Sequence, residues 1–205
     1  MNFDEFRRKM YGTGCFTPDQ AVALNSRFDK NNLVRWVSKK FLVKLRNGHY
    51  CFSEYLGEPN FSLFIANRIY RPSYISLHSA LSFYGLIPES VVQVTSVTTL
   101  KTSTFINEFG TFSYKTINPR LMFGYETRML SGKFTILLAS PEKALLDLLY
   151  LYPFYNTSGE FESLRLDREI LNEIIDKNTL QKFVTDFKSK AVDQRLMLLR
   201  KTYGL

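Results

Sequence analysis

Residues 31–52 of this chain have the sequence NNLVRWVSKKFLVKLRNGHYCF, which joins a helical pattern to a hairpin pattern. Leu33, Val37 and Phe41 recur at the three- and four-residue spacing of a helix that buries one stripe. The sequence therefore predicts a helix over residues 31–41. It begins with two asparagines, which are good helix-capping residues.

A hairpin is predicted directly after this helix. Residues 42–46 and 49–52 are rich in strand-forming side chains and flank Asn47-Gly48. Asn-Gly is the strongest short hairpin signal, because both turn residues accept a positive φ. A helix with one polar face followed by a basic hairpin is typical of a recognition helix and its wing.

Two further helices are predicted before this stretch. Apolar residues at helical spacing indicate a first helix over residues 3–10, and Thr17-Pro18 begins a second, over residues 19–24, with a cap and a proline in the first turn. Short helices followed by a hairpin match a winged helix-turn-helix in size and order. Residues 1–55 are therefore predicted to be a winged helix-turn-helix domain that binds DNA.

Positive charge is unevenly distributed along the chain, whose 205 residues carry a net charge of +8. Residues 1–55 contain 10 Lys/Arg against 5 Asp/Glu, residues 56–139 contain 7 against 4, and residues 140–205 contain 10 of each. A basic region at the helix-turn-helix pattern is expected for a protein that contacts DNA phosphates.

Composition argues against other classes of protein. An apolar fraction of 45% with 22% charged residues is ordinary for a folded chain. Cys15 and Cys51 form neither a disulfide framework nor a zinc pattern, so a reducing cytoplasm is predicted, with no metal or other cofactor. The acidic start is unlike a signal peptide, and the apolar run at residues 144–152 is short and contains Asp147. No membrane span is therefore predicted.

A second domain is predicted over residues 60–205, after a boundary at residues 54–60. Its first helices are expected over residues 61–70 and over residues 77–84, with Ser76 as cap and Gly85 as end. Strands are expected over residues 91–100, 109–117, 121–128 and 133–138. Helices are expected near residues 144–152, 167–175, 179–188 and 191–201, with a loop at 160–168. The predicted fold class is α+β, an N-terminal winged helix-turn-helix followed by a small, mainly antiparallel sheet flanked by helices.

Separate motifs of this second part resemble the pattern of a known family. They are residues 74–89 (YISLHSALSFYGLIPE), 95–98 (TSVT), 112–115 (FSYK), 123–125 (FGY) and 139–147 (ASPEKALLD). In this order they resemble the AbiEi-like antitoxins, which are bacterial transcriptional regulators from abortive-infection, type IV toxin–antitoxin operons. The resemblance extends from the helix-turn-helix to about residue 152.

The resemblance implies two roles. The winged helix would bind double-stranded DNA at inverted repeats in its own promoter and repress the operon. The C-terminal domain would counteract a partner toxin that resembles a nucleotidyltransferase. Whether DNA is bound by one copy or by two is left open.

The candidate DNA-binding residues lie on the polar face of the predicted helix and on the hairpin. Asn32, Arg35 and Lys39 are candidates for reading base edges, since arginine pairs with guanine and asparagine with adenine. The full predicted set is Asn31, Asn32, Arg35, Ser38, Lys39, Lys40, Lys44, Arg46 and His49, with Arg7 and Arg8 as further phosphate contacts. An ordinary solvated helix face is the alternative for the set, and a neutral position on the wing is the alternative for His49.

Glu142, Lys143 and Asp147 raise the alternative of a nuclease site. Ser140-Pro141 begins a helix there, however, and a glutamate at that point favours the positive helix end. Glu142 and Asp147 are separated by about 500° of helical turn at ~100° per residue, so they do not share one face. A structural role is predicted, with no catalytic residue.

Histidine and cysteine spacing predicts neither a metal site nor a nucleophile. His49 and Cys51 with Cys15 lack a fourth ligand and the usual paired spacing. His78 has no adjacent nucleophile pattern, and it is expected to face solvent or a partner.

The function predicted from the sequence is a cytoplasmic DNA-binding transcriptional regulator of the antitoxin type, without enzymatic activity. The alternatives are a protein-interaction module without specific DNA binding and a nuclease-type enzyme.

Overall fold

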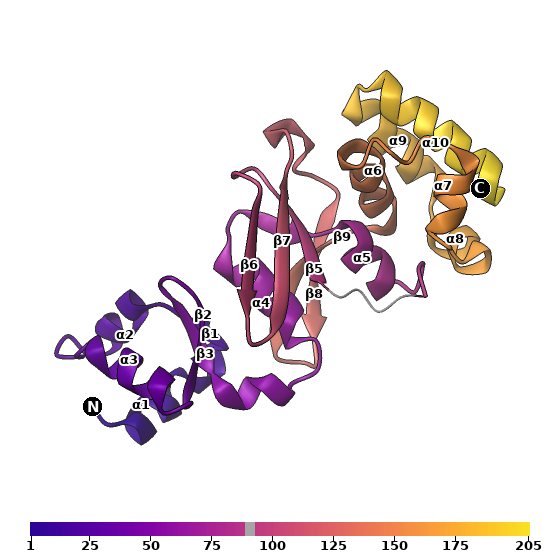
Figure 1. Cartoon of the computed structure of the whole chain (residues 1–205). Coiled ribbons are helices and arrows are strands. Elements are labelled where there is room, and N and C mark those ends of the chain that lie inside the picture. Colours follow the sequence, from indigo (N-terminus) through magenta and orange to yellow (C-terminus); the bar gives the residue numbers. More distant parts are fainter. Residues whose placement is uncertain (89–92) are drawn as a thin grey trace.

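Helices and strands alternate through most of the chain. The computed structural model describes residues 1–88 and 93–205, and the described strands form a three-stranded and a six-stranded sheet. Figure 1 shows the amino-terminal elements, the larger sheet and the C-terminal helices following one another across the molecule. The predicted mixture of α and β structure is confirmed at this level.

The amino-terminal part places three helices on a small sheet. Its elements are α1 (Phe3–Met10), a 3-10 helix (Tyr11–Thr13), β1 (Cys15–Phe16), α2 (Pro18–Leu24), α3 (Asn31–Ser38), β2 (Leu42–Arg46) and β3 (His49–Phe52). The sheet order is β1-β3-β2, with antiparallel neighbours. Thr17 starts α2 as predicted, with Gln20 as its partner in a capping box. The hairpin is confirmed, whereas β1 is too short to show a period and was not predicted.

The six-stranded sheet lies in the middle of the chain. Its elements follow a 3-10 helix (Ser53–Gly57) and are α4 (Phe61–Ile69), β4 (Ser73–Ile75), α5 (Leu77–Phe83), β5 (Gln93–Thr98), β6 (Ser103–Asn107), β7 (Gly110–Thr116), a 3-10 helix (Pro119–Leu121), β8 (Tyr125–Leu130) and β9 (Phe134–Ala139). The strand order is β6-β7-β5-β4-β9-β8. Since β5–β7 and β4–β9 are parallel, the sheet is mixed rather than small and mainly antiparallel.

Two predictions in this part need correction. The strand predicted over residues 91–100 ends early, because β5 covers Gln93–Thr98 and residues 99–100 lie beyond it, while residues 91–92 lie outside the described part of the chain. Ser76 precedes α5 at the capping position, but its side chain makes no capping bond and donates instead to Asp147 Oδ2 at 2.8 Å. Gly85 has the left-handed conformation expected after a helix, with φ 74°.

Five helices close the described chain. They are α6 (Pro141–Leu151), α7 (Ser158–Ser163), α8 (Arg168–Ile174), α9 (Lys177–Phe187) and α10 (Lys190–Tyr203), and α6 packs on α5, α9 and α10. The loop predicted at 160–168 was wrong over α7, which Thr157 and Glu160 begin with a capping box and Phe161 anchors in the core. Among the described helices, none combines the length and apolar character needed to cross a bilayer.

Aromatic rings join the amino-terminal part to the six-stranded sheet. Phe134 lies 5.6 Å from Tyr55 and 4.6 Å from Phe64 between ring centroids. Gly14 has φ 71°, and a Cβ there would come within 2.5 Å of the Phe64 ring. Tyr55 is buried whereas most of residues 54–60 are exposed, so the predicted boundary is anchored to the core by the Tyr55 ring. The division into two domains at this point stays a prediction.

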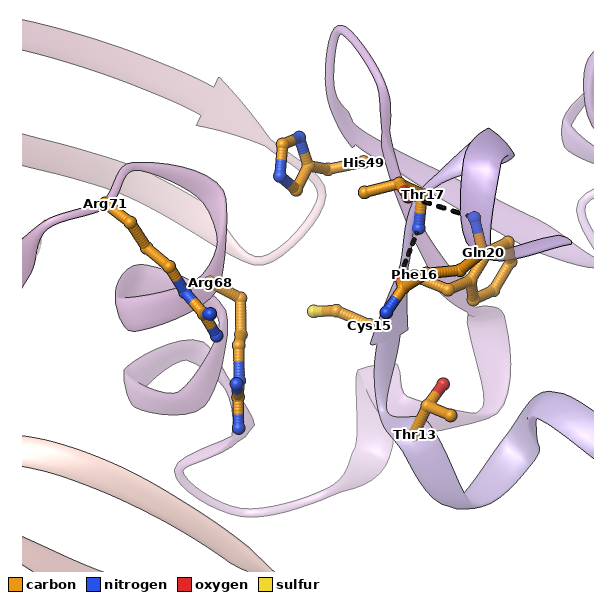
Figure 2. A pocket seen from close by; sticks show the side chains of 8 residues that line it. All are labelled: Thr13, Cys15, Phe16, Thr17, Gln20, His49, Arg68 and Arg71. Carbon is orange, nitrogen blue, oxygen red and sulfur yellow. Dashed lines mark hydrogen bonds between the residues drawn. The ribbon is translucent and has the colours of Figure 1, made fainter. Parts of the chain in front are cut away.

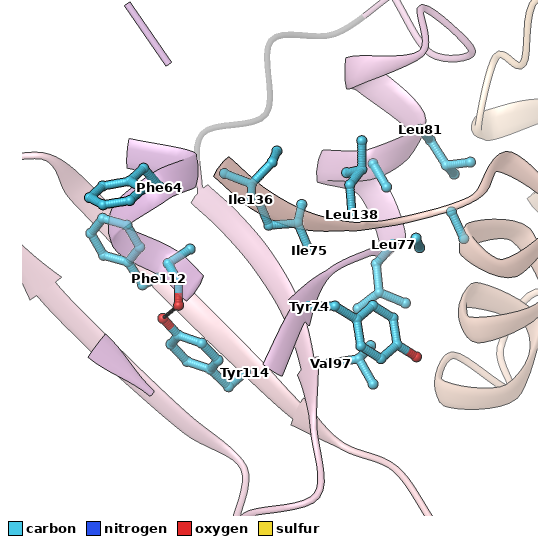
Figure 3. Close-up of a cluster of buried hydrophobic side chains, with 14 of the residues drawn as sticks. Phe64, Tyr74, Ile75, Leu77, Leu81, Val97, Phe112, Tyr114, Ile136 and Leu138 are labelled. Atoms are coloured by element: carbon cyan, nitrogen blue, oxygen red, sulfur yellow. Dashed lines mark hydrogen bonds between the residues drawn. The ribbon is translucent and has the colours of Figure 1, made fainter. Parts of the chain in front are cut away.

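The core of the larger sheet forms where α4 and α5 cover it. Figure 3 shows Phe64, Ile75, Phe112 and Leu138 in this cluster, all at most 2% exposed. Tyr114 belongs to the same cluster, and its hydroxyl donates to the Ala66 carbonyl at 2.7 Å. This bond ties α4 to β7.

Candidate nucleic-acid interface

α3 buries one side and exposes the other. Leu33 and Trp36 are buried, and the Trp36 ring lies 5.0 Å from Phe6 between centroids. The exposed side chains follow the spacing of a single helix face and are Asn31, Val34, Arg35 and Ser38. The structure thus brings three predicted contacts together in solvent, while Asn32 is half-buried.

The ends of α3 differ from the prediction. Neither asparagine caps α3: Lys30 occupies the capping position without a side-chain bond, and Asp29 Oδ1 accepts a hydrogen bond from the Asn31 amide at 2.9 Å. The helix ends at Ser38 rather than at residue 41, and Lys40 then takes a left-handed φ of 58°. Phe41 therefore leaves the buried stripe and is 42% exposed.

The cations beside this face are weakly held or unpaired. Arg35 Nη2 lies 3.0 Å from Asp29 Oδ2, with 64% and 50% of the two side chains exposed. Such exposed pairs contribute about 0–1 kcal/mol, so Arg35 can exchange Asp29 for another acceptor at little cost. Lys39, Lys40 and Lys44 are exposed, and none has a partner at salt-bridge distance among the described carboxylates.

The hairpin directs Lys44 and Arg46 differently. Only Gly48 of the two turn residues has a positive φ, 74°, and the register shifts between Lys44 and Arg46. Arg46 Nη1 donates to the Ile69 carbonyl at 2.6 Å, and its guanidinium carbon lies 4.6 Å from the Phe105 ring centroid. Arg46 therefore ties the hairpin to the six-stranded sheet and lies apart from the α3 surface.

His49 faces the same way as Arg46. It is half-buried and lines a cavity of about 430 Å³ with Thr17, Arg68 and Arg71 (Figure 2). Burial lowers the pKa of His49; the hydrogen bond to the Asn47 carbonyl opposes this shift, and the nearby charges of Arg46 and Arg71 add to it. The imidazole is therefore neutral near pH 7, which favours the alternative of a neutral position over a phosphate contact.

Arg7 and Arg8 also differ in their surroundings. Arg7 Nε lies 2.9 Å from Glu54 Oε1, and its guanidinium covers the Tyr11 ring at 4.7 Å from the centroid. Arg8 is exposed and has no described carboxylate at salt-bridge distance. Of the two, Arg8 has the surroundings expected of a phosphate contact.

Two exposed residues beside the predicted set were not predicted from the sequence. Val34 is 63% exposed on the α3 face, and Arg27 is exposed in the connection from α2 to α3. The signal for Val34 was present, because a residue next to Leu33 lies about 100° from the buried stripe. An exposed apolar side chain among polar ones suits contact with a thymine methyl group.

Glu142, one of the two acidic residues weighed as a nuclease site, makes internal contacts. It accepts a hydrogen bond from Ser140 Oγ at 2.8 Å and from the Asp176 amide at 2.9 Å. Glu142 therefore links the start of α6 to the start of α9.

Asp147 belongs to a buried network. Its carboxylate accepts hydrogen bonds from Tyr74 and Ser76, each at 2.8 Å, and from Lys143 Nζ. Asp147 and Lys143 are both 0% exposed, and the ammonium lies 4.8 Å from the Phe187 ring centroid. Burial raises the pKa of Asp147 and lowers the pKa of Lys143, while each partner opposes the shift of the other. The i,i+4 spacing of Lys143 and Asp147 on α6 is the sequence signal that could have predicted this pair.

The histidine and cysteine candidates are likewise packed. Cys15 and Cys51 are free thiols opposite each other in β1 and β3, and burial raises the pKa of Cys15 to about 12. His78 is half-buried, with Nε2 3.3 Å from the Tyr155 hydroxyl. Over the described residues, no three His, Cys, Asp or Glu side chains gather as a metal site.

Comparison with protein-family models and with curated proteins found no match for the chain. The resemblance to AbiEi-like antitoxins therefore rests on the sequence motifs alone. Two of those motifs meet in space, since Tyr74 and Ser76 of the first bind Asp147 of the last. Family membership stays a prediction.

Proposed function

We propose that the chain is a DNA-binding transcriptional regulator of the antitoxin type, and that residues 1–55 act as a winged helix-turn-helix. In this proposal α3 is the recognition helix and the β2–β3 hairpin is the wing. The order of elements supports it, because α2 and α3 are joined by a short connection and the hairpin follows α3 directly.

One observation carries the proposal, which is that the chain from α3 through β2 contributes cations and amides to its surface and no carboxylate. α3 has the sequence NNLVRWVS, without a carboxylate, and its exposed face continues into Lys39, Lys40 and Lys44. Asp29 is the carboxylate paired to this surface, and it is engaged by Arg35 and by the start of α3. A surface of amide donors and unpaired cations complements phosphates and base edges.

The proposed mechanism is occlusion of a promoter. The face of α3 that contains Asn31, Val34, Arg35 and Ser38 enters the major groove, which is wide enough for a helix. The three lysines after it contact the neighbouring phosphates and fix the register. A promoter occupied in this way is closed to transcription.

The test is an anisotropy titration of the full chain with its own upstream promoter DNA and with scrambled DNA, at about 50 mM and about 200 mM salt. We expect preference for the promoter and a steep loss of affinity with salt. The variant Lys39→Ala/Lys40→Ala/Lys44→Ala is expected to reduce the salt slope by about 2.7, at roughly 0.9 per phosphate contact.

A charge-matched control is Lys177→Ala/Lys182→Ala/Lys201→Ala, which removes three exposed lysines from the C-terminal helices. Its affinity and salt slope are expected to equal those of the unaltered chain. Equal loss in both variants would mean that only net charge matters. Equal affinity for promoter and scrambled DNA would favour the interaction-module alternative.

The antitoxin half of the proposal is supported by the resemblance. Its test is co-expression with the neighbouring gene, if that gene encodes a nucleotidyltransferase-like protein that arrests growth. Rescue of growth by the full chain supports the role, whereas arrest despite soluble expression contradicts it. We propose no catalytic step, and metal-dependent DNA cleavage lost in Glu142→Gln would contradict this.

A further inference from the structure

A second cavity, of about 600 Å³, lies where β4 and β9 part. These parallel strands pair at one point, Ile75 with Leu138. On the amino-terminal side of that pair, the cavity is lined from the strands by Ser73 and Leu137 and from α4 by Asn67. The opening is thus built into the sheet, and its volume is that of a typical small-molecule site.

The polar wall of this cavity contains buried atoms without a partner in the protein. Asn67 is 6% exposed, and its Oδ1 accepts the Leu137 amide at 2.6 Å, which leaves Nδ2 unpartnered. Ser73 is 4% exposed with an unpartnered hydroxyl, and Arg68 Nε is unpartnered as well. All three can donate, and burying donors without an acceptor costs free energy. The wall is complementary to an acceptor-rich group.

Charge favours the same kind of group. Arg68 and Arg71 line this cavity and the one shown in Figure 2, where both guanidinium groups lie on the same side of α4. Neither has a carboxylate partner among the described residues, and neither cavity is lined by one. Burial, and then the charge of Arg71, lower the pKa of Arg68. Two neighbouring guanidinium groups with free donors suit a phosphoryl group.

The rest of the lining is mainly apolar, with two threonines (Thr127 and Thr135), and it includes the aromatic ring of Tyr125. Met122, Ile136 and Leu137 line this side. Tyr125 stacks on Tyr74 at 4.6 Å and 15° between ring planes and is 36% exposed. An exposed tyrosine ring at the edge of an apolar wall suits a flat ring of a ligand.

We propose that this cavity binds a phosphorylated ring compound of the nucleoside monophosphate class. Arg68, Arg71 and the unpartnered donors of Asn67 and Ser73 hold the phosphoryl oxygens, and the flat ring lies against Tyr125. The site involves none of the residues assigned to DNA, so it stands or falls independently of the proposed DNA binding.

The test is calorimetric titration of the full chain, without DNA, with AMP, GMP, CMP and UMP. The unphosphorylated nucleosides and inorganic phosphate serve as partial ligands. At least one monophosphate is expected to bind at least about tenfold more tightly than its nucleoside, as expected for hydrogen bonds to a charged group. Inorganic phosphate is expected to compete. Absence of binding by all four, or a nucleoside that binds as tightly as its monophosphate, would overturn the proposal.

Variants locate the site. Arg68→Gln/Arg71→Gln is expected to weaken monophosphate binding at least about tenfold, while the charge-matched Lys177→Gln/Lys182→Gln, at exposed positions of α9, leaves it unchanged. Ser73→Ala is expected to weaken binding without lowering the urea midpoint, because its hydroxyl has no partner in the protein. Unaltered binding in the double arginine variant would overturn the proposal. So would weaker promoter binding of that variant without nucleotide, since the pair would then contact the DNA backbone.

Discussion

Lysines in two regions of this protein have opposite surroundings. Lys39, Lys40 and Lys44 stand in solvent beside α3, without a described carboxylate partner. Lys143 is 0% exposed, bound to Asp147 and surrounded by aromatic rings. Leaving an ammonium group in water has little free-energy cost, whereas burying it has a large one. The exposed and the buried lysines therefore have different roles. Exposed lysines are suited to binding, and the buried one to holding α6 against β4.

This difference predicts which substitutions change DNA binding and which change the free energy of unfolding. Removing an exposed charge is expected to leave the free energy of unfolding within about 0.5 kcal/mol, since no packing is lost. Removing one member of the buried pair leaves the other charge in a medium that solvates it poorly. Binding and folding are therefore expected to respond to separate sets of residues.

The largest effect is expected for Asp147→Ala. The substitution leaves Lys143 buried without its partner and leaves the Tyr74 hydroxyl without an acceptor. Loss of one partner of a buried pair costs about 3–5 kcal/mol of folding free energy. Urea unfolding followed by circular dichroism measures it.

A double variant shows whether the instability of Asp147→Ala comes from the unpaired charge of Lys143 or from the lost side-chain volume. Lys143→Met/Asp147→Leu removes both charges and keeps apolar bulk, and buried pairs replaced in this way are often neutral or stabilising. We expect its stability to exceed that of Asp147→Ala. A double variant as unstable as the single one would show that the pair is not the source of the loss.

Two neighbouring cations on the hairpin, Lys44 and Arg46, allow the same comparison between an exposed and a packed cation. Arg46→Ala removes a guanidinium bond to the Ile69 carbonyl, so it is expected to cost about 1.5–3 kcal/mol of folding free energy and to leave the salt slope of DNA binding unchanged. Lys44→Ala is the matched variant, expected to lower that slope by about 0.9 and to leave stability unchanged. If Arg46→Ala lowered the salt slope and Lys44→Ala did not, the DNA contact would lie on the side of the hairpin that carries Arg46 and not on the side that carries Lys44.

Arg35→Ala tests base reading on the exposed side. Its pair with Asp29 is exposed, so folding stability is expected to change by less than about 0.5 kcal/mol. Promoter affinity is expected to fall by about 1–3 kcal/mol, with relaxed preference at one base position. Competition titrations with single-base promoter variants measure both. Full affinity with full preference would remove Arg35 from the recognition face.

Local signals in the sequence predicted much of this arrangement. Thr17-Pro18, Asn47-Gly48 and Ser140-Pro141 mark two helix starts and a turn that the structure contains, because capping and turn geometry depend on adjacent residues. For α3, the three- and four-residue spacing of the apolar side chains predicted which side of the helix is buried and therefore which side is exposed. The end of α3 did not, since it depends on the left-handed conformation of Lys40.

Non-local features escaped prediction. The parallel pairing of β5 with β7 depends on β6, which forms a hairpin with β7 and returns it in the direction of β5. No period in the sequence distinguishes this from a simple antiparallel neighbour. The positions of Arg46 and His49 were missed for a related reason, because only tertiary packing decides that they face α4 and the larger sheet. Alternation along a hairpin does not say what covers each face.

The smallest effect on stability is expected at His49, which is half-buried and so is intermediate between the exposed lysines and the buried Lys143. Burial lowers its folded-state pKa below the ordinary 6.5, so the folded protein holds this proton less tightly than the unfolded chain. The stability that His49 contributes is therefore fully present above about pH 6.5 and is lost as the pH falls through the lowered pKa. In His49→Gln, urea stability is expected to decline less between about pH 7.5 and about pH 5.5 than in the unaltered chain. Parallel declines in the two proteins would mean that His49 titrates as freely as an exposed residue.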